Sequence, residues 1–95
     1  MPVSVIIAAK NEEQNIKACL ASIIKQNYPD FEIILVDDHS IDKTITVAKT
    51  FLPEFPGLKI VKAMNHGKKS AIQQGIHQAQ NEYLLFTDAD CKPRS

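Results

Sequence analysis

Short apolar runs alternate along this chain with stretches in which apolar residues recur every three or four positions. The runs are rich in β-branched and aromatic residues and predict strands, whereas the helical spacing between them predicts amphipathic helices. The predicted strands occupy residues 3–9, 31–36, 58–63 and 83–87. The predicted helices occupy residues 12–26, 41–52 and 70–79, and Asn11 with Gln14 resembles a capping box at the start of the first.

The order of these elements predicts an α/β fold. Strands that alternate with helices through short connections form parallel sheets with right-handed crossovers. We expect a three-layer, Rossmann-like sheet with the strand order 3-2-1-4, in which a crevice opens between the first and fourth strands. Gly75 lies inside the third predicted helix at a cost of about 1 kcal/mol relative to alanine, so we expect that helix to approach the sheet closely there.

Composition narrows the class of protein. The 95 residues allow one small domain, and eleven basic residues balance eleven acidic ones, so nothing favours nucleic acid as a partner. No apolar run approaches the roughly 20 residues that span a bilayer. Cys19 and Cys91 match no metal-ligand spacing, and we interpret Cys19 as a free buried thiol. We therefore expect a cytoplasmic protein, held at the cytoplasmic face of the membrane if a segment outside this chain anchors it.

The fourth predicted strand leads into two carboxylates, Asp88 and Asp90. Residues two apart on an extended chain point the same way, and adjacent carboxylates repel each other unless a cation lies between them. Such oxygen ligands suit Mg²⁺ or Mn²⁺ that carries substrate phosphates. An isolated Asp-x-Asp is more often a solvated turn, so the pair gains meaning only from its surroundings. Because the chain stops soon afterwards, we expect it to be part of a longer domain.

Polar residues should converge where the parallel strands end, in the crevice at the carboxyl edge of the sheet. They come from residues 9–12, 37–38 and 88–90. Asp37 also has a simpler interpretation, a hydrogen bond to backbone at the strand end, which would leave Asp38 as the ligand. The histidines are interpreted as turn or surface residues: His39, His66 and His77.

Four segments, in order and together covering most of the chain, resemble the amino-terminal half of a family 2 glycosyltransferase with the GT-A fold. Residues 3–13 resemble the opening strand and nucleotide loop, and residues 34–44 resemble the Val-Asp-Asp-x-Ser-x-Asp-x-Thr segment. Residues 65–76 resemble the Asn-x-Gly-Lys-x-x-Ala-x-x-x-Gly-Ile segment, and residues 87–90 the Asp-x-Asp metal motif. Each motif is weak alone, and the four together are specific.

The resemblance implies transfer of a sugar from a nucleotide diphosphate sugar, expected to be a UDP-sugar, with inversion of the anomeric centre. The acceptor would be a sugar, lipid or polysaccharide, as in the synthesis of cell-envelope polysaccharides. Mn²⁺ or Mg²⁺ would be bound by Asp90, with Asp88 contacting the metal or the ribose. Asp38 would accept a hydrogen bond from the base, and Lys68 or Lys69 would approach the ribose or diphosphate. The nucleoside site would also be lined by Ala8, Ala9, Lys10 and Glu12.

The catalytic base of the family lies well beyond the metal motif, so we expect it after Ser95 and expect these 95 residues alone to be inactive. Apolar surface left uncovered by the missing part would favour self-association. The first loop also departs from the family pattern. Many relatives carry an aromatic residue where this chain has Lys10, which has an aliphatic stem but no ring to stack on a base, so the identity of the base stays open.

Two other functions are compatible with parts of the sequence. Residues 31–40 also resemble the start of a response-regulator receiver, whose paired acids bind Mg²⁺, although a complete strand–helix unit precedes them here. A nucleotide-binding fragment without activity of its own is the second alternative. A phosphate-binding P-loop before Ser70 is excluded, because the required glycine five positions before Gly67 is replaced by Lys62.

Overall fold

The computed structural model describes residues 2–26 and 30–88. Its elements alternate as predicted, and all four strands are parallel in the order β3-β2-β1-β4. The strands are β1 (Val3–Ala9), β2 (Phe31–Asp37), β3 (Leu58–Lys62) and β4 (Tyr83–Asp88). The helices are α1 (Ile16–Ile24), α2 (Thr44–Lys49) and α3 (Lys68–Gln78).

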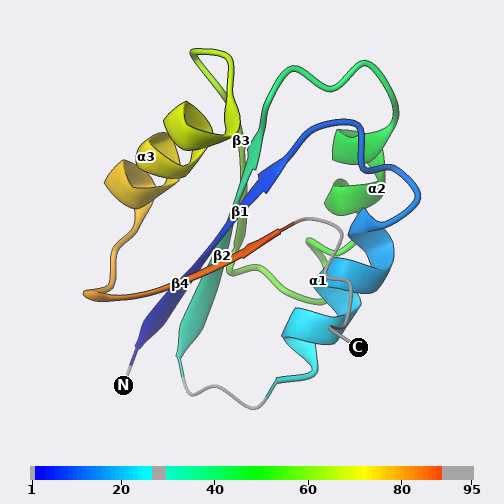
Figure 1. The fold of residues 1–95 in the computed structure, drawn as a ribbon. Helices are drawn as coiled ribbons and strands as arrows, with labels where there is room; N and C mark the ends of the chain where they lie inside the picture. Colours follow the sequence, from blue (N-terminus) through cyan, green and yellow to red (C-terminus); the bar gives the residue numbers. More distant parts are fainter. Residues whose placement is uncertain (1, 27–29, 89–95) are drawn as a thin grey trace, which may run out of the picture.

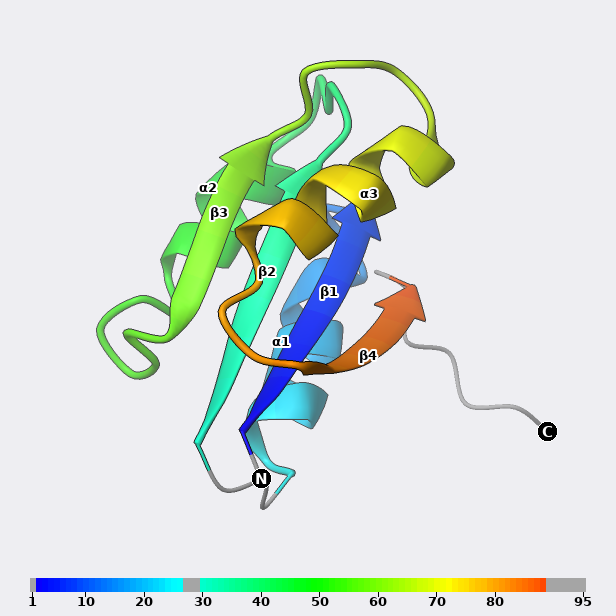
Figure 2. The same cartoon turned by 90° about the vertical axis from the view of Figure 1, so that its left-hand side faces the viewer.

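The sheet lies between two helical layers, which confirms the predicted three-layer fold. Helices α1 and α2 cover one face and α3 covers the other (Figure 1). Figure 2 shows the four strands side by side, with β1 in the interior of the sheet. Because the strands are parallel, the loops that follow β1 and β2 open at one edge, where β4 also ends.

Alternate side chains of the strands enter two separate cores. On the α1 and α2 side, strand residues such as Ile7 and Leu35 pack with Leu20. On the α3 side, Ile34 and Val36 pack with helix and loop residues. Strands β1 and β2 therefore bury both of their faces, as strands of a parallel sheet do.

Helices α1 and α2 are shorter than predicted. Helix α1 begins at Ile16, with Asn15 rather than Asn11 at its N-cap, so the predicted capping box is wrong. Helix α2 begins at Thr44 rather than at Ile41, and Ile41 is 92% exposed. Helix α3 instead begins at Lys68, two residues earlier than predicted.

Strand β4 is less buried than its apolar sequence predicts. It pairs with β1 and forms one edge of the sheet. Leu85 is 41% exposed and Phe86 is 48% exposed. These two side chains are in register with Val5 and Ile6, which point to opposite faces, so neither helical layer covers β4 fully. An edge position explains the exposure that composition alone did not indicate.

Two further points concern the class of protein. Cys19 is disulfide-bonded rather than a free thiol, so that interpretation was wrong. Within residues 2–26 and 30–88, no helix has the length and apolar character needed to cross a membrane.

Candidate nucleotide site

Hydrogen bonds join the loop that follows β1 to the loop that follows β2. The Asn11 N–H donates to Ser40 Oγ at 2.8 Å, and Asn11 Oδ1 accepts from the Ile41 N–H at 2.8 Å. The Glu12 N–H donates to Thr44 Oγ1 at 2.9 Å. These long-range bonds occupy the groups that would otherwise cap a helix, and this is why α1 begins later than the sequence predicts.

A second set of hydrogen bonds joins the same two loops. The Glu13 N–H donates to Asp42 Oδ2 at 3.1 Å, and Glu13 Oε1 accepts from the Lys43 N–H at 3.0 Å. The Thr44 hydroxyl and N–H both donate to Asp42 Oδ1. The hydrogen bond from Thr44 holds the pKa of Asp42 below its ordinary value of 3.8, against the opposing effect of burial. These hydrogen bonds between the loops therefore hold both loops in place at the carboxyl edge of the sheet.

Asp37 ends β2 and plays a structural part. Its Oδ2 accepts from the Ser40 N–H at 3.1 Å, and its carbonyl oxygen accepts from the Ala63 N–H at 2.8 Å. The prediction that Asp37 bonds to backbone is thus confirmed. Its Oδ1 is buried and has no hydrogen-bond partner among the described residues.

Asp38 follows directly, is 5% exposed and has contacts to both carboxylate oxygens. Oδ1 lies 2.9 Å from Nδ1 of His39, and Oδ2 accepts from the Gly67 N–H at 3.0 Å. The hydrogen bond with His39 lowers the pKa of Asp38 from its ordinary value of 3.8. Burial raises it, while the Gly67 N–H and the charges of His39 and Lys10 lower it further. Asp38 therefore stays ionised and ready to accept a hydrogen bond.

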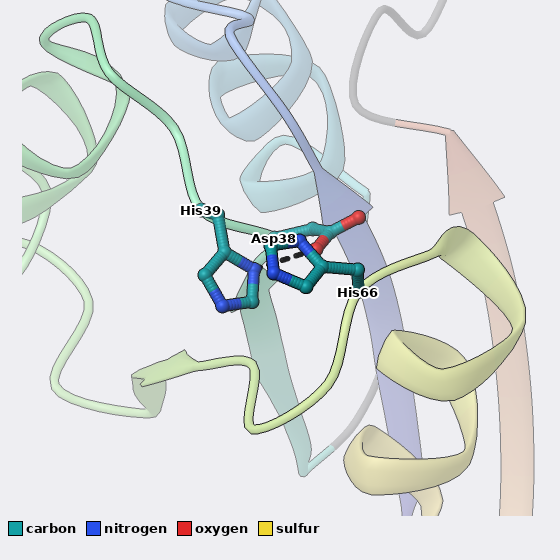
Figure 3. A group of neighbouring side chains, drawn as sticks. All are labelled: Asp38, His39 and His66. Atoms are coloured by element: carbon teal, nitrogen blue, oxygen red, sulfur yellow. Dashed lines mark hydrogen bonds and ion pairs between the residues drawn. The ribbon is translucent and has the colours of Figure 1, made fainter.

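The His39 ring also stacks on the ring of His66, which comes from the loop between β3 and α3. The ring centroids are 3.8 Å apart and the planes differ by 18°. Figure 3 shows both rings beside Asp38. One nitrogen or oxygen atom from each of Asp38, His39 and His66 lies within 4.8 Å of the others, so the group offers three candidate ligands for a metal ion. Among residues 2–26 and 30–88, it is the one such cluster of three.

The structure places the other predicted site residues around this edge. Ala8 and Ala9 end β1 beside Val36 and Asp37, and exposed Lys10 follows. Glu12 is half-buried, and its carboxylate accepts from the Asn15 side-chain amide at 3.0 Å. The remaining residues lie on two other elements: Lys68 and Lys69 in the first turn of α3, both exposed, and Asp88 as the last residue of β4, in register with Ala8. Asp90 lies outside the described residues.

Sequence reasoning missed the two contacts that hold Asp38. Gly67, whose N–H donates to Asp38, lies 29 positions further along the chain, so no local pattern joins it to Asp38. One local signal existed, because His39 directly follows Asp38 in the sequence and its side chain could reach the carboxylate. His39 is in the predicted turn, but its imidazole engages the carboxylate.

A comparison with known protein families shows the family of this chain. Residues 4–94 match the family model described as glycosyl transferase family 2. The chain belongs to glycosyltransferase family 2. The match confirms the resemblance found in the sequence and argues against a receiver, whose strand order of 2-1-3-4-5 also differs from the order seen here.

Several family members and solved structures are similar along nearly the whole chain. Glycosyltransferase AglE of Haloferax volcanii is 37% identical over 94 residues, which are 96% of this chain and 31% of that protein. The poly-beta-1,6-N-acetyl-D-glucosamine synthase of Staphylococcus epidermidis is 33% identical over 93% of this chain and 21% of its own length. The chain thus spans about a third or less of these relatives.

Two solved structures share the fold and carry nucleotides. The mannosyltransferase PcManGT of Pyrobaculum calidifontis, in complex with GDP-Man and Mn²⁺, has a TM-score of 0.86 and 31% identity over 93% of this chain and 27% of its own. TarS of S. aureus, in complex with UDP, has a TM-score of 0.87 and 32% identity over 95% of this chain and 28% of its own. The fold of this glycosyltransferase chain is accordingly that of the GT-A enzymes.

Proposed function

We propose that this chain is the donor-binding part of an inverting, metal-dependent glycosyltransferase that uses a UDP-sugar. The observation that carries the proposal is Asp38, an ionised and nearly buried acceptor at the carboxyl edge of the sheet. A uracil base carries an N–H group, and such a carboxylate can accept a hydrogen bond from it. The relatives support a nucleotide-sugar donor, although one solved neighbour holds GDP-Man and another holds UDP.

The remaining residues would each bind one part of the donor. Ala8 and Ala9 would form the floor of the nucleoside site, because small side chains leave room for a ligand, and Lys10 would cover it. Lys68 and Lys69 would approach the ribose or the diphosphate, whose negative charge they complement. Glu12, whose carboxylate already bonds to Asn15, would contribute mainly through its backbone position.

Asp88 and Asp90 would hold Mn²⁺ or Mg²⁺. The backbone of Asp88 ends β4 in register with Ala8, which places it at the same edge as Asp38, and carboxylate oxygens are suitable ligands for either ion. When bound, the cation would neutralise charge on the departing diphosphate. We further propose that these 95 residues bind the donor without transferring sugar.

The proposal also includes the acceptor and the location of the protein. The similarity to a poly-beta-1,6-N-acetyl-D-glucosamine synthase supports a sugar, lipid or polysaccharide acceptor and a role in cell-envelope synthesis. Nucleotide sugars are made inside the cell, so we place the protein in the cytoplasm or at the cytoplasmic face of the membrane. We propose no nucleic-acid partner.

Calorimetric titration of UDP, GDP and ADP into the chain tests the donor assignment. UDP should bind most tightly, and Asp38→Asn should weaken UDP more than ADP, because the substituted amide presents its own N–H groups to the base. Asp30→Asn, which changes an exposed carboxylate at the opposite edge of the sheet, is the matched control. Equal binding of all three nucleotides, both by the unmodified chain and by the Asp38→Asn variant, would refute base recognition by Asp38.

A further inference from the structure

The direction of the Asp38 carboxylate is fixed by its two contacts. His39 Nδ1 meets one oxygen and the Gly67 N–H meets the other. An ionised carboxylate accepts about four hydrogen bonds, so capacity for a ligand N–H remains. Because an ionised carboxylate only accepts, Nδ1 of His39 carries the proton of this contact. The two bonds therefore decide where the remaining lone pairs point.

The backbone at His39 indicates that its side chain has a role. His39 has a φ of 59°, a left-handed conformation that glycine adopts without strain and that asparagine, aspartate and histidine adopt more often than other residues. Residues held in such conformations cluster at functional sites. The imidazole supplies a contact that glycine would lack, the one between Nδ1 and the Asp38 carboxylate.

His66 limits the rotation of the His39 ring. The two rings lie nearly parallel, and they come from different loops, as Figure 3 shows. This stacking also argues against a metal ion as the purpose of the cluster. The lone pairs of imidazole nitrogens lie in the ring planes, so two stacked rings cannot both direct a lone pair at one ion unless they first separate. The arrangement suits orientation better than coordination.

We propose that His39 is a positioning residue for nucleobase recognition, which directs the Asp38 carboxylate toward an N–H of the base. His66 stacks on the His39 ring and limits its rotation. The inference rests on the proposed function and adds the residue that controls base discrimination. Without the Nδ1–H donor, only the Gly67 N–H still orients the carboxylate. A base with an N–H then loses most of its advantage in affinity over a base that lacks one.

The test compares UDP with N3-methyl-UDP, which lacks that N–H, by calorimetry in the absence of metal. The unmodified chain should bind UDP roughly tenfold more tightly, the size expected for one hydrogen bond to a charged group. His39→Gly removes the imidazole without backbone strain and should bring the ratio of dissociation constants close to one. His39→Asn keeps an N–H donor near the position of Nδ1 and should restore most of the ratio.

Two more variants complete the set. His66→Ala removes the stacked ring and should lower the ratio to a value between those of the unmodified chain and His39→Gly. His77→Asn, on the exposed surface of α3, should leave it unchanged. Thermal melts show whether each variant is folded. A nitrogen-15 spectrum of the free chain at pH 8 should show His39 protonated at Nδ1, whether or not any nucleotide binds.

The outcomes separate the two proposals. If the unmodified chain binds neither nucleotide, the proposed function fails, and a His39 ring protonated at Nε2 alone would overturn the positioning role as well. If the unmodified chain discriminates and His39→Gly discriminates equally, the positioning role is wrong while the proposed function stands. Zn²⁺ binding that is abolished by both His39→Gly and His66→Ala would also overturn it, because the cluster would then be a metal site.

Discussion

Gly75 of α3 lies directly against Ile6 of β1: a Cβ atom built on Gly75 would stand 2.6 Å from Cγ2 of Ile6. That distance is too short for any real contact. Ile6 is 1% exposed and lies on the interior strand β1, so its side chain is closely packed and cannot easily move away. The same Cβ would lie 3.3 Å from Cγ2 of Val36. The glycine therefore sets the distance between α3 and the sheet, which confirms the close approach predicted from the sequence.

Gly75→Ala should destabilise the fold even though alanine is the better helix former. Overpacking a core costs about 1–3 kcal/mol, and the gain in helix propensity returns about 1 kcal/mol. We expect a net loss of up to about 2 kcal/mol in the free energy of unfolding, measured by urea titration. Gln73→Ala, on the exposed side of the same helix, gains propensity without a clash and should be neutral or stabilising. Equal behaviour of the two variants would contradict the packing argument.

The fold could be predicted because its main signals are local. The apolar runs gave the four strands, and the lengths of the connections gave the parallel order. What failed depended on contacts between distant residues. Asn11 resembled a helix cap, but Ser40 and Ile41 use its hydrogen bonds. Leu85 looked buried by composition, but only the position of β4 at the sheet edge determines its exposure.

The candidate site shows the same division. Asp38 could be singled out because it follows a buried strand in a motif with a known role. The partners of its carboxylate could not be derived, because Gly67 lies 29 positions away and donates through its backbone, which no side-chain pattern reveals. The stacking of His39 on His66 likewise requires two loops to be placed in space.

At the amino end of the sheet, a buried polar network should contribute to stability. Ser4 Oγ donates to Glu32 Oε2 at 2.6 Å, and the Gln80 N–H donates to the same oxygen at 2.7 Å. The Asn81 N–H donates to Ser4 Oγ at 3.3 Å. Ser4→Ala should cost about 1–3 kcal/mol, because it removes a donor from a buried carboxylate and an acceptor from the loop before β4. Urea titration against Thr46→Ala, which removes an exposed hydroxyl, measures the effect.

The same network should make the fold sensitive to acid. Burial raises the pKa of Glu32, but hydrogen bonds from Ser4, Gln80 and Lys59, with the charge of Lys59, outweigh it and hold the pKa below the ordinary value of 4.5. A carboxyl with a lowered pKa in the folded state stabilises the fold above its unfolded pKa, and this contribution disappears as the pH falls through the folded pKa. Stability should thus decline below about pH 4.5.

Glu32→Gln tests the assignment of that acid sensitivity. The variant should be less stable than the parent at pH 7 but should lose less stability between pH 5 and pH 3, as followed by thermal melts. Part of the slope should remain, because the pKa values of Asp38 and Asp42 are also lowered. An unchanged slope would show that Glu32 is not responsible.

The uncovered side chains of β4 should promote self-association of these 95 residues. Tyr83, Leu85 and Phe86 are each at least 41% exposed, and they lie on β4, which stands last in the strand order of the described sheet. Strands at sheet edges can pair with a strand of another chain. Sedimentation velocity should show dimers or larger species as the concentration rises. Leu85→Lys should reduce them, whereas Ile41→Lys, at a 92% exposed loop position, should not. A monomer at every concentration would contradict this expectation.

Nucleotide and metal should each strengthen the binding of the other. Two carboxylates compete poorly with water for Mg²⁺ or Mn²⁺, so Asp88 and Asp90 should hold the ion well only when a diphosphate completes its oxygen ligands. Coupling of this kind is reciprocal, and we expect Mn²⁺ to raise the affinity for UDP about tenfold, within the usual range for linked sites. Calorimetry with and without Mn²⁺ measures the factor, and UMP, which lacks the second phosphate, should show much less of it.

Two substitutions should separate the metal site from the base site. Asp90→Asn keeps the shape of the side chain and removes one charged ligand, so it should abolish most of the enhancement by Mn²⁺ and leave the affinity without metal nearly unchanged. Asp38→Asn should weaken UDP binding by a similar factor with and without Mn²⁺, because we propose that the Asp38 carboxylate binds the base and not the metal. If Mn²⁺ changed the affinity for no diphosphate, the Asp-x-Asp motif would be a solvated turn. If the chain instead bound Mg²⁺ alone and then a phosphoryl mimic, the metal motif would serve a chemistry other than sugar transfer.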